Sequence, residues 1–545
     1  MKELFVIKES NTFSETLEVL GLAYLIDNVF QRTLPVEKPD ILIEDRNSYY
    51  LISLSKDLDQ KIIDECNYFD FFRYIGKKVS DKNLLKFRGI NYEEEKGVRR
   101  KYYKLTADEK KETEQKPHPF YDVIRMCASM GAYNKSFLNC RLFEDHFPFL
   151  LNKVFMFYSF SNLTDREQLV KNIDREARAK GIQINKINSL QDLNPHKGKG
   201  VNQNKANGIK PGSQKNFWLQ QLLRFSGLWQ GFVSGYISKK DYKSYVIVPS
   251  NISFEYLRSV YRAFRNLIQS AGSVKFDIIL VLILTQKLIE HSKHYQDEWS
   301  FEPINNKISG FQFAYYKSLG QRPAVTNIGF LGLPKFIKFK SEEDGYVWLD
   351  VLTEHIAAIR SINDNHSSNI KMLQCYRQFI SASDFMSFFE FQFHYATYLI
   401  NSYLQKKYFV KLFSIQKMEV LMGTNKTYQK IITNKGFQAI AKAIRNSTII
   451  PIILKNNKDA IFGLSQKFKI ASKDKDTFVS EVSQFIQLYN ERIMLKDYKK
   501  RKHQKYVTTE ELSEFYKLLD DNYSAKLIAG MLIAFGFARE VNENK

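Results

Sequence analysis

The sequence predicts an α+β, multi-domain protein with a mixed α/β N-terminal domain, residues 1–417, followed by an all-α C-terminal helical bundle, residues 418–545. The chain has 545 residues, which is more than the roughly 250–300 at which a single hydrophobic core stops growing. Short strand-like runs occur before residue 350, whereas helical periodicity is almost continuous after about residue 418. A hydrophobic content of 44% is enough to fill cores of this size.

The N-terminal part mixes helix-like and strand-like segments. Apolar residues at helical spacing predict a helix over about 14–34, and the short apolar run at 49–55 predicts a strand. Residues 119–193 are expected to be helical, and residues 217–230 to form an aromatic helix that ends in glycine-rich turns. A second strand is expected at 242–249.

The remaining apolar runs complete the expected organisation. Residues 276–284 are too short to cross a membrane, which takes about 20 apolar residues, so they predict a buried helix or strand. Residues 330–340 and 346–352 are expected to be extended. Residues 350–415 are expected to be helical, and the chain after Met418 to form four or five helices.

Two segments break these patterns. Residues 76–118 are dense in charge and are expected to hold one or two helices and then a solvated linker. Residues 194–216 contain four Gly, two Pro and no apolar periodicity, which predicts a long loop. Loops of this length within compact domains are typically functional or disordered.

The net charge of +22 and the pI of about 9.4 favour a polyanionic partner, because such an excess of charge opposes compaction. The alternative is a soluble protein whose composition is generally rich in lysine. The clustering of the basic residues therefore matters more than their total.

No motif for an enzyme active site is present. The sequence lacks a P-loop, a nucleophile elbow and an HExxH helix, so we expect a protein that is not an enzyme and has no cofactor. The alternative is a nuclease with a dispersed metal site, for which His291, His294, Asp297 and Glu298 are the candidate ligands. A solvated helix end is the competing interpretation of that group.

The sequence features that bear on compartment favour the cytoplasm. The four Cys are scattered and form no CxxC pair, which fits a reducing environment better than a disulfide scaffold. The N-terminal residues lack the apolar core and cleavage site of a signal peptide. We expect a cytoplasmic protein without a membrane partner.

The strongest basic segment is free of acidic residues from 193 to 240. Lysines in a Gly- and Asn-rich loop suit phosphate contacts, and Asn and Gln amides suit contacts with base edges. Arg224 lies in the same acid-free run. The alternative is an ordinary flexible loop. The candidate DNA-binding residues of this loop are Lys197, Lys199, Asn202, Gln203, Asn204, Lys205 and Lys210.

Two further basic segments are candidates for contact with a nucleic-acid backbone. Cations interleaved with aromatic residues suit single-stranded nucleic acid, and the first segment has this pattern beside Tyr102 and Tyr103. A charged helix face and a solvated interhelical loop are the respective alternatives. The candidate residues are Arg88, Arg99, Arg100 and Lys101 in the first segment, and Lys499, Lys500, Arg501 and Lys502 in the second.

Three segments are similar to one known family: the loop and helix at 194–230, KGFQAIAKAIRNSTII at 435–450, and LIAGMLIAFGFARE at 527–540. They resemble segments in large subunits of type I CRISPR effector complexes (Cascade) of the I-A and I-B kind. The resemblance covers about 194–230 and 418–545 and is loose elsewhere. It implies an N-terminal domain that reads the protospacer-adjacent motif, and a helical region similar in role to the small subunit, which stabilises the R-loop.

The resemblance implies partners as well. These are a CRISPR RNA, target double-stranded DNA, the backbone and small subunits, and a helicase-nuclease or transposition proteins. RNA pairing would select the target sequence, while protein reads a short motif and backbone shape. The competing function is a stand-alone nucleic-acid-binding protein, which would share the charge and the lack of catalytic motifs.

Met418 and Met422 lie where the mixed pattern gives way to continuous helix. In the family that this chain resembles, an internal start commonly yields a separate small subunit. We therefore consider both residues as internal start candidates, with a chance position of two methionines as the alternative.

Overall fold

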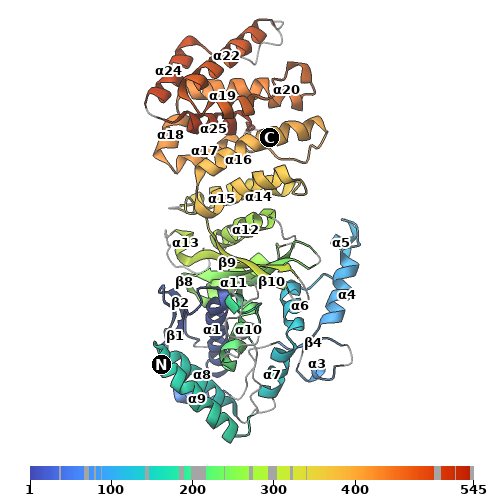
Figure 1. Ribbon diagram of the computed structural model, residues 1–545, viewed down its shortest axis with the longest axis vertical. Coiled ribbons are helices and arrows are strands. Elements are labelled where there is room, and N and C mark those ends of the chain that lie inside the picture. The colour runs from blue at the N-terminus through green and yellow to red at the C-terminus, as the bar shows by residue number, and fades with distance from the viewer. Residues whose placement is uncertain are drawn as a thin grey trace. The chain divides into compact units, whose positions relative to one another are not determined.

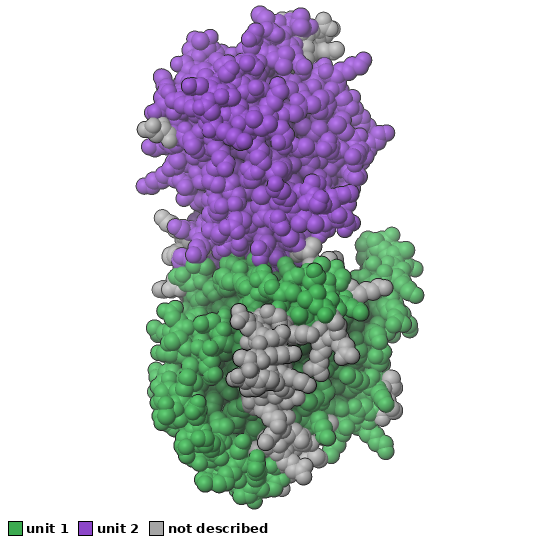
Figure 2. Space-filling model, in the orientation of Figure 1, with its two compact units in different colours: residues 1–273, 305–332 green, residues 274–304, 333–545 purple. Residues whose placement is uncertain are grey.

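The computed structural model divides the chain into two compact units (Figures 1 and 2). Unit 1 comprises residues 1–273 and 305–332, and unit 2 comprises 274–304 and 333–545. Helices make up 62% and strands 13%, so the α+β class is confirmed. The residues that the structure describes are 1–35, 38–66, 73–78, 81–87, 89–141, 146–182, 189–197, 217–238, 240–268, 274–292, 303–319, 323–338, 341–495, 505–521 and 523–540.

Unit 1 contains two antiparallel four-stranded sheets, with strand orders β1-β3-β2-β8 and β10-β9-β7-β6. The strands predicted at 49–55 and 242–249 are confirmed as β3 and β7. A short parallel pair, β4 and β5, stands apart from both sheets. The strands are β1 (Glu3–Ile7), β2 (Ile41–Asp45), β3 (Tyr49–Leu54), β4 (Ile75–Gly76), β5 (Ile90–Asn91), β6 (Phe232–Tyr236), β7 (Tyr242–Pro249), β8 (Asn251–Ser253), β9 (Ile308–Ser318) and β10 (Pro323–Gly332).

Two buried helices, α1 (Phe13–Thr33) and α10 (Trp218–Gly231), pack side by side in the core of unit 1 (Figure 1). Their backbones approach closely at two glycines. A Cβ atom added at Gly21 would lie 2.0 Å from the carbonyl oxygen of Leu223, and one at Gly227 would lie 2.0 Å from that of Leu17. Both positions therefore require glycine for steric reasons.

We expect Gly21→Ala and Gly97→Ala to change stability in opposite directions. Alanine favours a helix by about 1 kcal/mol over glycine, and at Gly97 on α4 the added methyl group would meet nothing within 4 Å. At Gly21 the same methyl group collides with backbone, and overpacking of a core typically costs about 1–3 kcal/mol. Urea denaturation of the two variants checks this, and a stabilising Gly21→Ala would contradict the close packing.

The other helices of unit 1 surround these elements. The segment at 119–193, which was expected to be helical, contains α6 to α9. The helices are α2 (Gln60–Glu65), α3 (Asn83–Lys86), α4 (Tyr92–Tyr102), α5 (Glu109–Glu112), α6 (Tyr121–Ser129), α7 (Gly131–Arg141), α8 (Phe147–Ser159), α9 (Leu163–Ala179), the 3₁₀ turn η2 (Pro195–Lys197), α11 (Phe254–Arg265) and α13 (Ile304–Lys307), the last of which begins at the final residue of a unit 2 segment.

The regular secondary structure described in unit 2 is helical, apart from an isolated β-bridge between Ser414 and Arg539. The apolar run at 276–284 lies within α12, and the domain boundary expected after residue 417 falls inside this unit, within α17. The helices are α12 (Val274–Ser292), α14 (Glu342–Ser361), α15 (Ser367–Ala382), α16 (Phe385–Leu404), α17 (Ile415–Gly423), α18 (Lys426–Ile432), α19 (Lys435–Ser447), α20 (Ile449–Ile453), η4 (Asn457–Asp459), α21 (Leu464–Ala471), α22 (Lys475–Met494), α24 (Thr509–Asp520) and α25 (Ala525–Gly536).

Aromatic side chains fill the core of unit 2 around one buried histidine. His355 contacts the rings of Phe388 and Phe413, and its Nδ1 atom lies 2.5 Å from the hydroxyl oxygen of Tyr376. Burial lowers the pKa of His355 to about 3, so it is neutral at physiological pH. This histidine belongs to the core and not to a site.

Three predictions of secondary structure are wrong. The chain after Met418 was expected to form four or five helices, but its described residues contain all or part of eight α-helices, α17 to α22, α24 and α25. Residues 346–352 were expected to be extended but lie in α14, whose N-cap Ser341 accepts a hydrogen bond from the backbone of Asp344. In this run Trp348, Val351 and Leu352 are buried while Tyr346 is 55% exposed, which is the pattern of a helix. The segment after α10 was expected to form glycine-rich turns, but it forms β6 because it pairs with β7.

Candidate functional site

A pocket of about 460 Å³ in unit 1 brings together cations and tyrosines from segments that are distant in the sequence. We call it the basic pocket. It lies between the end of α4, the start of α6, the strand β6 and the end of α11, and α4 and α6 lie side by side in Figure 1. Its lining includes the cations Arg99, Lys110, Lys116, Arg125 and Arg265, and the tyrosines Tyr102, Tyr103, Tyr121 and Tyr236.

Helix α4 separates acidic from basic residues along its length. Its first turn carries Glu93, Glu94 and Glu95, where the N-cap Asn91 accepts hydrogen bonds from the backbone of Glu93 and Glu94. Its last turn carries three cations. Acids at the start and cations at the end of a helix both interact favourably with its dipole and stabilise it. The positive charge therefore lies at the end of α4 that borders the basic pocket.

Two arginines that line the basic pocket lie over aromatic rings. The guanidinium of Arg99 is 4.8 Å from the ring centre of Tyr103 and 4.6 Å from that of Tyr121. The guanidinium of Arg125 is 3.7 Å from the ring centre of Tyr236. Cation–π contacts of this kind hold long side chains in place without neutralising their charge.

The carboxylate that lines the basic pocket, Asp122, forms an ion pair within the protein. Asp122 accepts a hydrogen bond of 3.0 Å from Nη1 of Arg265, and one of 2.7 Å from the backbone of Ser234. Arg265 is only 5% exposed, so this pair belongs to the wall of the pocket. Among the residues that the structure describes, no carboxylate forms an ion pair with Lys110, Lys116 or Arg125.

His118 also lines the basic pocket and is uncharged at neutral pH. Burial lowers its pKa, and the positive charges of Arg73 and Arg265 lower it further. Its Nδ1 atom accepts a hydrogen bond of 3.0 Å from the backbone of Phe120. The positive charge of the pocket therefore comes from arginine and lysine, and it persists across the physiological pH range.

Three of the four residues that were predicted in the 76–118 segment lie on α4. Arg99 lines the basic pocket. Arg100 and Lys101 are exposed on the same helical turn but do not line it. Arg88 lies outside the described residues, as do Lys499, Lys500, Arg501 and Lys502.

Lys197 is the described member of the predicted motif-reading loop, and the structure places it apart from the basic pocket. It is half-buried at the end of η2, and burial together with the nearby Arg224 lowers its pKa. The other predicted residues of this loop lie outside the described residues: Lys199, Asn202, Gln203, Asn204, Lys205 and Lys210.

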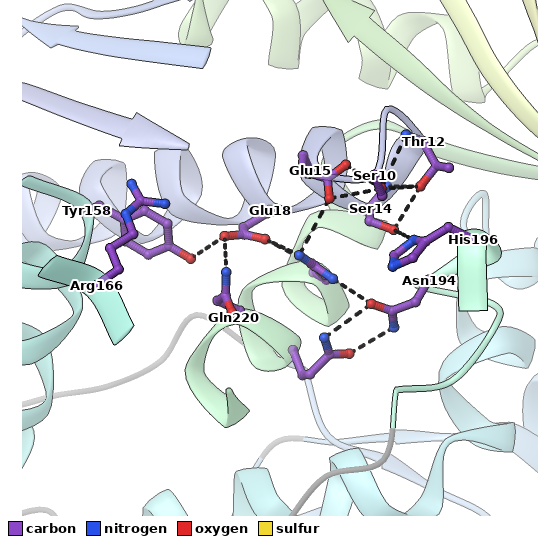
Figure 3. A network of polar contacts seen from close by, with 12 residues as sticks. Ser10, Thr12, Ser14, Glu15, Glu18, Tyr158, Arg166, Asn194, His196 and Gln220 are labelled. Carbon is purple, nitrogen blue, oxygen red and sulfur yellow. Dashed lines mark hydrogen bonds and ion pairs between the residues drawn. The ribbon is translucent and has the colours of Figure 1, made fainter. Parts of the chain in front are cut away.

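A buried polar network joins both flanks of that loop to α1 (Figure 3). Arg224 on α10 donates from Nε to Glu18 at 2.8 Å, and from Nη1 to the side chain of Asn194 at 2.5 Å. Tyr158 donates to Glu18 at 2.7 Å. His196 Nδ1 lies 3.4 Å from the hydroxyl of Ser14, which belongs to α1.

The network shows that Arg224 is not a surface cation, although it lies in the acid-free run of the sequence. Arg224 is 3% exposed, and Glu15 and Glu18 beside it are 2% and 1% exposed. Burial raises the pKa of Glu15 despite the opposing charge of Arg224. The acids that neutralise Arg224 belong to α1, about 200 residues earlier in the chain, so the acid-free run gives no sign of them.

Met418 and Met422 are both buried in α17, at 1% and 0% exposure. α17 begins at Ile415, so a product that started at Met418 would lack the beginning of this helix. It would also lack α16, which packs against α25 through Phe389 and Gly530.

The alternative metal site is only partly within the described chain. His291 lies at the end of α12, whereas His294, Asp297 and Glu298 fall outside the described residues. The described ranges contain no group of three or more His, Cys, Asp or Glu side chains that could hold a metal ion. Within the same ranges, no helix combines the length and hydropathy needed to cross a membrane.

Sequence reasoning missed several residues of the basic pocket. Lys110 and Lys116 lie in the charge-dense segment, which contains many lysines, and nothing in the sequence distinguishes these two from the others. Arg125 and Tyr236 come from α6 and β6, which carry no local signal of function. No protein-family model matches this chain, and no curated protein matches its sequence.

Proposed function

We propose that this chain binds nucleic acid through the basic pocket and does not itself catalyse a reaction. The observation that carries the proposal is one concave site in which four tyrosines lie beside Lys110, Lys116 and Arg125, three cations that form no ion pair with a described carboxylate. Phosphate groups require cations that are not already paired, and unstacked bases require aromatic surfaces. The basic pocket supplies both.

The tyrosines favour nucleic acid over a small inorganic anion. A phosphate or sulfate ion needs two or three donors, whereas about 460 Å³ is in the range of sites for ligands of several rings. Tyr103 is 53% exposed, which leaves a large aromatic surface available at the rim. Arg100 and Lys101 extend the positive charge beyond the rim on α4.

More specifically, we propose that the chain is a non-catalytic subunit of a CRISPR RNA-guided surveillance complex. This proposal rests on the sequence resemblance of 194–230 and 418–545 to Cascade large subunits. In that role the chain would recognise the protospacer-adjacent motif and stabilise the R-loop, with a CRISPR RNA and backbone subunits as partners. Purification of the tagged chain from its native host tests it, because a stand-alone nucleic-acid-binding protein would not bring a guide RNA or backbone subunits with it.

Removal of the rim tyrosines tests the general proposal. The variant Tyr102→Ala/Tyr103→Ala is expected to weaken binding of a fluorescent single-stranded oligonucleotide about ten- to hundredfold, because the loss of one stacked base costs about 1–3 kcal/mol. Fluorescence anisotropy measures the loss. The control is Tyr102→Phe/Tyr103→Phe, which keeps the rings and should bind like the wild type. Equal binding by the alanine variant would contradict a stacking role for these residues.

A further inference from the structure

A second concave site, the lysine pocket, lies at the other end of α6 from the basic pocket. It has a volume of about 420 Å³, and its lining includes Tyr74, Lys77, Lys78, Asp81 and Lys135. The first three residues belong to the segment around β4, and Lys135 belongs to α7. The lysine pocket therefore resembles the basic pocket in its cations, while its one tyrosine, Tyr74, is 7% exposed.

The lysines of this pocket are available to a ligand. Lys77, Lys78 and Lys135 are all exposed, and no carboxylate in the described part of the chain forms an ion pair with them. Asp81 accepts hydrogen bonds of 2.6 Å from the hydroxyl of Tyr74 and 3.0 Å from the backbone of Asn83. Its oxygens are thus already engaged within the protein.

Helix α6 holds the two pockets at a fixed separation. Tyr121, Asp122 and Arg125 line the basic pocket from its beginning, whereas Ala128 lines the lysine pocket from its end. Asn134 ties β4 to this helix, because its side chain accepts from the backbone of Ile75 at 3.1 Å and donates to the carbonyl of Cys127 at 2.9 Å. A helix of nine residues is about 13 Å long.

A further cation, Arg73, lies close to both pockets. Arg73 immediately precedes Tyr74 of the lysine pocket, and its guanidinium lies 5.3 Å from the ring centre of Trp229. Its charge also acts on His118 of the basic pocket, whose pKa is lowered by burial first and by Arg73 next. Arg73 therefore adds positive charge in the neighbourhood of both pockets.

We propose that one single-stranded nucleic acid occupies both pockets and follows α6 between them. This inference rests on the proposed function of the basic pocket and adds the path and the strandedness of the ligand. The spacing corresponds to about four nucleotides of a stacked strand, which rise 3.4 Å each, and to fewer when the strand is extended. Single strands fit best, because only unpaired bases can leave their stack to enter pockets and contact tyrosine rings.

A length series of oligonucleotides tests this path. The wild-type chain should bind oligothymidylates and oligouridylates with affinity that rises steeply up to about six nucleotides, where both pockets can be filled. The variant Lys77→Glu/Lys78→Glu/Lys135→Glu should bind the longer oligomers about tenfold more weakly, with a salt slope smaller by about 2. It should bind trinucleotides like the wild type. The control Lys61→Glu/Lys171→Glu/Lys180→Glu changes three exposed lysines on other elements of unit 1 and should behave like the wild type.

The outcomes separate this inference from the proposed function. If the wild-type chain binds no oligomer, the proposed function itself fails. If it binds but the lysine-pocket variant matches it at every length, the path along α6 is overturned and binding at the basic pocket stands. Equal binding of a fully paired duplex would overturn the preference for a single strand. The variant Lys77→Gln/Lys78→Gln/Lys135→Gln repeats the comparison without charge reversal, which guards against misfolding.

Discussion

The variant Lys110→Glu/Lys116→Glu/Arg125→Glu is expected to bind single-stranded nucleic acid about a hundredfold or more weakly than the wild type. Each of the three residues lines the basic pocket, and none forms an ion pair with a described carboxylate. In the proposed complex these charges neutralise phosphates, and each phosphate contact contributes about 0.7 to the slope of log K against log salt for single strands. Reversal replaces attraction with repulsion at every contact. Fluorescence anisotropy over a series of salt concentrations measures both the affinity and the slope.

The matched control for this experiment changes the net charge by the same amount elsewhere. Lys61, Lys171 and Lys180 are exposed on α2, on α9 and at the end of α9, and none lines the basic pocket. Reversal of these three lysines should leave the affinity within about threefold of the wild type at 0.15 M salt, where charges more than about 8 Å apart are screened. If both variants lose affinity equally, binding depends on overall charge and not on the basic pocket.

The second large effect concerns folding. The variant Arg224→Met is expected to destabilise unit 1 by about 3–5 kcal/mol, because it leaves buried carboxylates without their partner. Arg224 contacts Glu18 at 2.7 Å and Glu15 at 3.9 Å, and all three residues are at most 3% exposed. Hydrogen exchange with mass spectrometry should show faster exchange in peptides from α1 and α10, while peptides from α19 and α25 of unit 2 are unchanged.

A double-mutant cycle separates the ion pair from simple loss of packing. Glu18→Gln combined with Arg224→Met should be less destabilising than the two single changes added together, because the double variant buries less unpaired charge. Strict additivity would contradict the pairing of Glu18 with Arg224. The conservative change Arg224→Lys should restore little stability, because lysine cannot reach both Glu18 and Asn194 in the planar geometry of arginine.

Local patterns predicted much of the fold. The helix expected at 14–34 and the strand expected at 49–55 were confirmed as α1 and β3, because periodicity reports burial directly. The apolar run at 346–352 was wrongly predicted to be extended, because its aromatic and β-branched residues are typical of a strand. The capping serine and three acids at 341–344, which indicate the start of a helix, were given less weight. In that case the helix start was the better signal.

The candidate site was predicted only where its residues lie in one segment. Arg99 was identified because cations and tyrosines alternate around it, and it lines the basic pocket. Arg125 and Tyr236 were not identified, because their contact at 3.7 Å joins elements more than a hundred residues apart. The pairing of Arg224 could not be predicted for the same reason, since the acids that neutralise it belong to α1.

Ultraviolet crosslinking of the wild-type chain to a single-stranded oligonucleotide, followed by mass spectrometry of the crosslinked peptides, tests the central claim most directly. The account predicts crosslinks at Tyr102, Tyr103, Tyr121 or Tyr236, whose rings line the basic pocket. These crosslinks should disappear in the Lys110→Glu/Lys116→Glu/Arg125→Glu variant. Crosslinks confined to other parts of the chain, or an absence of binding under low salt, would contradict the assignment of the basic pocket as the nucleic-acid site.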